Sequence, residues 1–137
     1  GFERVTKEAF DLVIMNPPYV RSERQGATDY SRTYSEVSHR GTDLSAFFVY
    51  RALRQWVKPG GTLAFIVPIG LMEAEYGGPL RRVLREYKIK LIADLEGLGR
   101  TTFRGIKRPT VIVVVEKTAP STDDDVEMLQ LDESCIT

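Results

Sequence analysis

The chain has 137 residues, 42% of them hydrophobic and 28% charged, which is typical of an ordinary soluble globular protein of one domain, and its net charge of zero gives no sign of a polyanionic partner. The single cysteine, Cys135, excludes an internal disulfide and a cysteine-rich zinc site and fits a reducing cytoplasm, and with only one histidine we expect no metal site. The longest apolar run, residues 63–72, has about half the ~20 residues that a membrane helix needs, so no membrane partner is expected.

The first predicted elements are a strand, a helix and a second strand. Residues 10–15 (FDLVIM) form an apolar run that is long enough for a strand buried on both faces and too short for a helix. From Asp43 onward, apolar residues recur at helical spacing over roughly four turns, with Thr42 or Asp43 as the N-cap and the KPGG run at 58–61 as the stop. Residues 62–67 (TLAFIV) then predict a second buried strand.

A second helix and two further strands complete the pattern. Gly78-Pro79 is a helix start, because proline at the first helical position gives up no hydrogen bond that the helix needs. Residues 89–95 (IKLIADL) and 110–116 (TVIVVVE) are the third and fourth strands, with no helix between them. The order β-α-β-α-β-β predicts an α/β fold with a mainly parallel, doubly wound sheet whose last strand runs antiparallel.

Two segments lie outside this predicted core. Residues 20–42 are almost entirely polar and show no periodicity, and a loop of that length is normally functional or disordered. Residues 118–137 carry six acidic side chains and no basic one. We interpret them as an acidic linker toward a further domain, which leaves residues 1–117 as the folded unit.

The first strand ends in Asn16-Pro17-Pro18-Tyr19, an unusual ending for a buried strand. In an open α/β sheet, ligands bind at the carboxyl ends of the strands, where these residues are expected. The two prolines fix their own φ angles and hold the preceding residues extended, so the turn is rigid. Amide and carbonyl acceptors beside an aromatic ring, with no titratable base, suit a planar heteroaromatic ring that carries an amino group. The alternative is that the prolines merely end the strand and Tyr19 covers the sheet edge.

The run DLVIMNPPYV at 11–20 resembles the catalytic motif of the N6-adenine DNA methyltransferases of bacterial restriction-modification systems. The blocks DLSAFFVYRALRQWVKPGGTLAFIVP and YGGPLRRVLREYKI resemble the region that follows this motif, so the likeness covers residues 8–117. It implies the C-terminal half of a Rossmann-like class I methyltransferase sheet, with the 10–15 strand at an exposed edge.

The same resemblance implies a role for each residue of the turn. Asn16 through its side-chain oxygen and Pro17 through its carbonyl would accept hydrogen bonds from the amino group of a flipped adenine, in a catalytic turn completed by Pro18. Holding both N–H groups favours a more pyramidal nitrogen, placed in line with the methyl group of S-adenosylmethionine. Tyr19 would stack on the base, and Phe103 would be a second stacking aromatic, with a hydrophobic anchor for its loop as the alternative role for Phe103.

The cofactor implied by the resemblance is S-adenosylmethionine, but its main binding motifs are not in this segment. The family binds it with a glycine-rich turn and an acidic residue, and neither occurs in this sequence. We expect that half of the domain upstream, in the usual motif order, with a downstream position in a permuted order as the alternative. We therefore expect the 137 residues to be inactive alone. DNA sequence recognition is expected in a separate specificity domain or subunit.

Double-stranded DNA is the expected partner. Nine basic side chains stand against three acidic ones between residues 81 and 108, and three of the basic ones follow Phe103 and are candidates for salt-dependent phosphate contacts: Arg104, Lys107 and Arg108. Arg21 and Arg24, in the loop after Tyr19, are the other DNA-backbone candidates. A solvated helix face and a disordered polar loop are the alternative interpretations. The exposed 10–15 strand also predicts self-association of the segment.

Two other functions remain open at this point. The amide nitrogen of a protein glutamine fits the same acceptors, and so does an RNA base, so a glutamine-N5 or RNA methyltransferase is the first alternative. The second is a non-catalytic, methyltransferase-like DNA-binding module.

Overall fold

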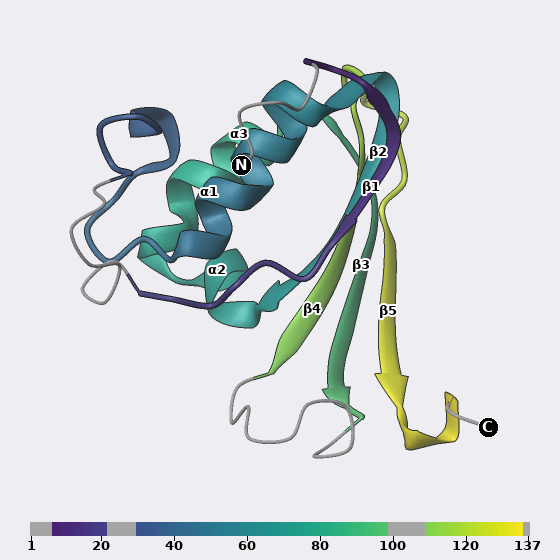
Figure 1. The fold of residues 1–137 in the computed structure, drawn as a ribbon. Helices are drawn as coiled ribbons and strands as arrows, with labels where there is room; N and C mark the ends of the chain where they lie inside the picture. The colour runs from purple at the N-terminus through teal and green to yellow at the C-terminus, as the bar shows by residue number, and fades with distance from the viewer. Residues whose placement is uncertain (1–6, 22–29, 99–108, 136–137) are drawn as a thin grey trace.

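A five-stranded mixed sheet forms the centre of the molecule, with the helices on one of its faces (Figure 1). The computed structural model describes residues 7–21, 30–98 and 109–135. In the order in which they lie side by side, the strands are β1 (Phe10–Met15), β2 (Val57–Pro68), β4 (Thr110–Glu116), β3 (Lys88–Gly97) and β5 (Glu127–Asp132). β1 runs parallel to β2, and β4 runs antiparallel to both of its neighbours. The predicted α/β class and the antiparallel fourth strand are confirmed.

The helical layer is built from α1 (Leu44–Arg51), α2 (Ile69–Glu73) and α3 (Gly78–Leu84). Asp43 is the N-cap of α1, because its side chain accepts a hydrogen bond from the Ser45 N–H at 2.9 Å. A π-helical turn, Ala52–Trp56, extends α1, and Pro79 stands in the first turn of α3 as predicted. None of the helices in the described part of the chain is long and apolar enough to span a membrane.

Strand β2 begins earlier than the sequence predicts. The sequence predicts that the helix ends at the KPGG run and that the strand starts at residue 62. In the structure β2 starts at Val57, which pairs with Phe10 of β1. The register between β1 and β2 then shifts between Phe10 and Leu12, which accommodates the KPGG run inside the strand. The tertiary pairing with β1 therefore extends the strand beyond its own apolar pattern.

The hydrophobic core lies between the sheet and the helices. Alternate residues of β2 and β4 are completely or almost completely buried on this face, namely Leu63, Phe65, Val67, Val111, Val113 and Val115. The helices cover them with their own buried side chains, among them Val49, Leu53, Leu80 and Leu84. This packing holds the carboxyl ends of β1 and β2 in place, which is where the candidate site begins.

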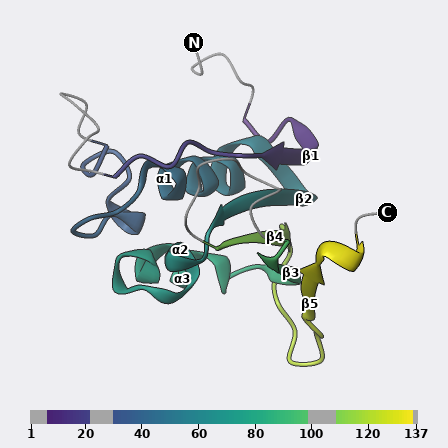
Figure 2. The same cartoon turned by 90° about the horizontal axis from the view of Figure 1, so that it is seen from below.

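None of the three α-helices lies on the opposite face of the sheet. Figure 2 shows all three helices to one side of the strands. Across this open face, Ile14, Ala64, Val114 and Leu91 are register partners on four adjacent strands, and all four are apolar. Ile14, on the edge strand, is 74% exposed. The sheet therefore carries an apolar row that no described helix covers.

The segment interpreted as an acidic linker contains a strand, which corrects that interpretation. Residues Glu127–Asp132 form β5, which pairs in parallel with β3 at the edge of the sheet farthest from β1. Its side chains are almost all exposed, so the sequence lacks the alternation that marks a half-buried strand. The acidic turn before it is anchored too, because Asp124 forms an ion pair of 2.7 Å with Lys88 at the start of β3.

Part of the polar segment 20–42 is built into the helical layer. Tyr30 and Tyr34 pack against Phe47 of α1, with ring centroids 6.0 and 5.8 Å away, and Val37 is completely buried. Glu36 accepts hydrogen bonds from Tyr50 and Arg54 on the α1 side. A few apolar and acidic side chains in a mostly polar segment are enough to fix it against the helix.

Candidate functional site

The four residues of the Asn-Pro-Pro-Tyr turn lie directly after β1, at the carboxyl ends of the parallel pair β1 and β2. The last register pair of these strands is Met15 with Phe65, after which the chain leaves the sheet. Pro17 is buried, whereas Asn16 and Pro18 are exposed and Tyr19 is partly buried. The turn thus presents an amide to solvent while one of its prolines is fixed in the protein.

The structure brings the side chains of Asn16 and Tyr19 together. The Tyr19 hydroxyl lies 3.0 Å from the Asn16 Oδ1 atom and also 3.0 Å from the main-chain carbonyl oxygen of Ile66 on β2. Burial, and secondly the negative charge of Asp43, raise the pKa of Tyr19 above its ordinary value of 10.0. The hydroxyl therefore stays protonated at neutral pH and acts there as a hydrogen-bond donor.

The chain beyond the turn is tied to the start of α1. The carbonyl of Val20 accepts a hydrogen bond of 2.8 Å from the Leu44 N–H, and Arg21 forms an isolated antiparallel bridge with Asp43. Because Asp43 also caps α1, the same residue orders the helix start and the segment after the turn. The turn is therefore held at both ends, by β2 on one side and by α1 on the other.

Of the predicted DNA-backbone residues, the structure describes Arg21, whose side chain is exposed just beyond the turn. The remaining candidates for base stacking and phosphate contact lie outside the described residues: Arg24, Phe103, Arg104, Lys107 and Arg108.

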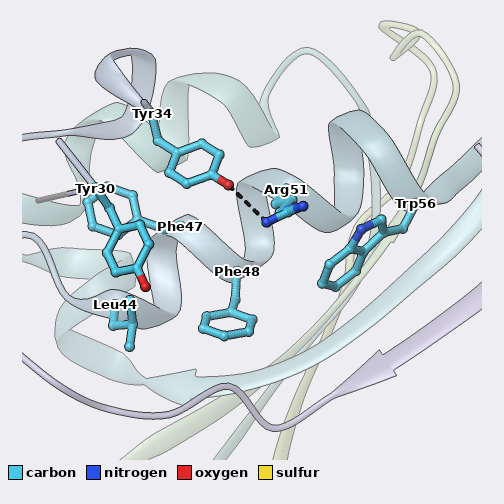
Figure 3. Close-up of a pocket in the computed structure, with 7 residues that line it drawn as sticks. All are labelled: Tyr30, Tyr34, Leu44, Phe47, Phe48, Arg51 and Trp56. Atoms are coloured by element: carbon cyan, nitrogen blue, oxygen red, sulfur yellow. Dashed lines mark hydrogen bonds between the residues drawn. The ribbon is translucent and has the colours of Figure 1, made fainter. Parts of the chain in front are cut away.

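An aromatic hollow of about 120 Å³, which the sequence did not predict, lies on α1 beside the segment that follows the turn (Figure 3). It is lined by Tyr30, Tyr34, Leu44, Phe47, Phe48, Arg51 and Trp56. The Arg51 guanidinium lies 5.8 Å from the centre of the Trp56 ring and donates a hydrogen bond of 3.2 Å to the Tyr34 hydroxyl. Leu44 belongs both to the hollow and to the contact with Val20, so the hollow adjoins the segment that follows the turn.

The sequence did contain a signal for this hollow. The apolar stripe that predicts this helix consists of Ala46, Val49, Tyr50, Leu53 and Val57. Other residues recur at the same helical spacing on a second side of the helix, namely Leu44, Phe47, Phe48 and Arg51. A helix with large apolar residues on two sides has one side left for a ligand or a partner after the core is built. Faces of aromatic rings with a guanidinium among them suit a planar, π-rich ligand.

Comparison with known proteins finds relatives that are type II methyltransferases. The chain is 37% identical over 90 residues to the type II methyltransferase M.PaeR7I of Pseudomonas aeruginosa, covering 63% of this chain and 15% of that protein. It is 32% identical over 116 residues to the type II methyltransferase M.XhoI of Xanthomonas vasicola, covering 82% of this chain and 21% of that protein. The chain therefore spans only about a fifth of the length of these relatives or less.

Solved structures agree on the fold. A Listeria monocytogenes protein assigned to the class I S-adenosylmethionine-dependent methyltransferases superposes with a TM-score of 0.68 at 20% identity, over 90% of this chain and 37% of that one. The sequence model of the family described as Eco57I restriction-modification methylase matches residues 2–100, which include β1, the Asn-Pro-Pro-Tyr turn, the aromatic hollow and α3. The chain belongs to the Eco57I family of restriction-modification methylases.

Proposed function

We propose that these residues are the target-base half of an adenine-N6 DNA methyltransferase. The observation that carries the proposal is the pairing of the Asn16 Oδ1 acceptor with the Tyr19 side chain at the carboxyl end of β1. An amide oxygen and an aromatic ring in one rigid turn provide what an adenine needs, namely an acceptor for its amino group and a surface for its ring. Family membership and the type II methyltransferase relatives support this assignment.

The chemistry of the turn follows from the low nucleophilicity of the adenine amino group, whose lone pair is delocalised into the ring. Asn16 through Oδ1 and Pro17 through its carbonyl would each accept one N–H of that amino group. Fixing both N–H groups orients the lone pair out of the ring plane and holds the nitrogen in position, which lowers the barrier through proximity and preorganised electrostatics. Tyr19 would stack on the extruded base and compensate part of the stacking lost in the duplex.

The cofactor implied by the family fits part of the structure. S-adenosylmethionine supplies an electrophilic methyl group on a sulfonium, and its adenine ring is planar and π-rich. The hollow offers the side chains of Phe48, Trp56 and Arg51 for such a ring, and it adjoins the segment after the turn. The glycine-rich turn of the family is not in this sequence, so the hollow would be one wall of a site completed by the rest of the parent protein.

The DNA would approach over the turn. Arg21, exposed after Tyr19, would contact a phosphate of the target strand, and we retain Arg24, Arg104, Lys107 and Arg108 for the same role. Phe103 is retained as the second stacking aromatic. The parent protein would add the sequence-recognition part as a specificity domain or subunit, since the relatives are far longer than this chain.

The test is methyl transfer from labelled S-adenosylmethionine to unmethylated duplex DNA by the full parent chain. We expect label at adenine N6, and we expect Asn16→Ala to lower kcat by about 10²- to 10³-fold, because one preorganised acceptor at the reacting nitrogen is lost. Gln130→Ala is the matched control, since it removes an exposed amide from β5, at the edge of the sheet farthest from β1. It should leave kcat unchanged.

The same assay separates the other substrates. A glutamine-containing protein substrate and a single-stranded RNA are incubated beside the DNA, and the labelled product is identified by mass spectrometry. Label on glutamine N5 or on RNA, with none on DNA, would refute the assignment to DNA. Label on DNA that Asn16→Ala does not reduce would refute the role given to Asn16.

A further inference from the structure

The Tyr19 hydroxyl has two hydrogen-bond acceptors and only one proton to share between them. Its oxygen lies 3.0 Å from Asn16 Oδ1 and 3.0 Å from the Ile66 carbonyl oxygen, and both are acceptors only. A single O–H group can form one strong bond or two weaker, shared ones. The hydroxyl is thus a donor that can shift between a side chain of the candidate site and the backbone of β2.

The Ile66 acceptor is available because β1 ends just before it. The β1–β2 register stops at Met15 and Phe65, one residue short of Ile66. The chain then continues with Pro17 and Pro18, which have no N–H group and cannot extend the ladder of backbone hydrogen bonds. The Tyr19 side chain returns to β2 and supplies the donor that the backbone lacks. The two prolines therefore end the backbone pairing, and the tyrosine hydroxyl provides the hydrogen bond that takes its place.

This arrangement matters for Asn16, which is otherwise an exposed side chain at the end of a strand. An exposed carboxamide is free to rotate, and its oxygen and nitrogen can exchange places. A donor held on β2 favours the carboxamide orientation that turns Oδ1, and not the amide nitrogen, toward the Tyr19 hydroxyl. When a substrate amino group donates to Oδ1, the hydroxyl retains the Ile66 carbonyl and is not left unpaired.

We propose that the Tyr19 hydroxyl is a positioning group that orients the Asn16 carboxamide for the substrate amino group, in addition to any stacking by the Tyr19 ring. This inference rests on the proposed function, because it assumes that Asn16 accepts a hydrogen bond from the substrate. The burial that raises the pKa of Tyr19 supports it, since a protonated hydroxyl can donate throughout the pH range of an ordinary assay. The Ile66 carbonyl belongs to β2 and holds the Tyr19 hydroxyl in place.

The test is Tyr19→Phe in the full parent chain, which keeps the ring and removes the hydroxyl. We expect kcat for DNA methylation to fall about five- to tenfold, the effect of one lost hydrogen bond, because Asn16 is no longer held in the productive orientation. KM for DNA should not change, and neither should the fluorescence of a 2-aminopurine placed at the target base, because the ring still stacks. Tyr19→Ala should alter both of these quantities as well as kcat.

Tyr50→Phe is the matched control. It removes a tyrosine hydroxyl that donates to Glu36 and not to a residue of the turn, and it should leave kcat unchanged. A kcat for Tyr19→Phe equal to wild type would overturn the inference and leave the proposed function intact. A fall in 2-aminopurine fluorescence matching the fall in kcat would overturn it too, because the hydroxyl would then act on base binding. If wild type does not methylate DNA, the proposed function itself fails.

Discussion

Phe48 and Trp56 are the residues through which the aromatic hollow can be tested. Phe48 lies on α1 and Trp56 at the end of the π-helical turn, and Figure 3 shows Phe48 between Leu44 and Trp56. We predict that Phe48→Ala weakens the binding of S-adenosylmethionine to the full parent chain about tenfold, because a stacking face and its apolar area are lost. Isothermal titration calorimetry measures this directly.

Two further variants test whether the weaker binding of S-adenosylmethionine by Phe48→Ala arises from the hollow. Trp56→Phe should remove the change in tryptophan fluorescence that we expect when S-adenosylmethionine binds to the wild-type chain. Met128→Ala, which shortens an exposed apolar side chain on β5, is the control and should bind the cofactor as wild type does. An unchanged dissociation constant for Phe48→Ala would show that the hollow takes no part in cofactor binding.

Glu36 provides a residue-scale prediction of pH dependence. The hydrogen bond from Tyr50 is the main cause that lowers the pKa of Glu36 below its ordinary value of 4.5, and Arg54 adds to it. A carboxylate whose pKa is lower in the folded than in the unfolded state stabilises the fold when the pH is above its unfolded-state pKa. This contribution is lost as the pH falls through its folded-state pKa. The contribution is therefore present at pH 7 and disappears below pH 4.5.

We predict that Glu36→Gln lowers the free energy of unfolding at pH 7 by less than about 1 kcal/mol, because the Glu36 side chain is 45% exposed. The difference from wild type should shrink as the pH falls through the lowered pKa of Glu36. Urea unfolding at pH 7, 5 and 3 measures it. A difference that stays constant down to pH 3 would mean that the ionisation of Glu36 is not the cause.

At the scale of elements, the junction between α2 and α3 depends on a close approach at Gly77. A Cβ atom at residue 77 would lie 1.9 Å from the Leu71 carbonyl oxygen of α2, which is backbone and cannot move aside cheaply. We predict that Gly77→Ala destabilises the fold by about 2 to 4 kcal/mol, because the two helices must separate. Thermal unfolding followed by circular dichroism detects such a loss.

The neighbouring glycine is the matched control. A Cβ atom at Gly78 would meet only the ends of two arginine side chains, at 3.7 and 3.9 Å, and the residue has helical backbone angles of φ −53° and ψ −46°. Gly78→Ala should therefore be neutral or slightly stabilising, since alanine favours the helix. Equal melting temperatures for the two variants would contradict the close approach inferred at Gly77.

The whole molecule is a half-covered sheet. Strands of parallel sheets are normally buried on both faces, yet here the described helices cover one face only, and β1 is an edge strand with Leu12 and Ile14 exposed at 54% and 74%. Both the open face and the unpaired edge favour contact with another chain. We therefore predict that the isolated 137-residue segment self-associates as its concentration rises.

Ile14→Lys should reduce this association, because it places a charge on the open face of the edge strand without touching the core between sheet and helices. Thr122→Lys, which adds the same charge in an exposed loop, is the control and should associate like wild type. Light scattering across a concentration series gives the comparison. A monomeric wild-type segment at high concentration would refute the prediction.

The sequence by itself determined the elements whose signals are local. Apolar runs predicted β1, β3 and β4 because their side chains are largely apolar. The sequence marked the helix starts at Thr42 or Asp43 and at Pro79, and the structure has the cap at Asp43. The missing helix between β3 and β4 indicated their antiparallel pairing. The Asn-Pro-Pro-Tyr turn was placed correctly after β1, since prolines end a strand wherever it lies.

Only the tertiary structure decided the rest, because it depends on contacts between distant residues. β5 forms because β3 offers it a parallel edge, although its own side chains remain exposed. The bond from Tyr19 to Ile66 joins residues 47 positions apart, and the hollow combines a polar loop with a second side of α1. The local sequence pattern reflects the conformation that each segment prefers. The contacts between segments depend on how their buried faces pack together, and the local pattern does not contain that information.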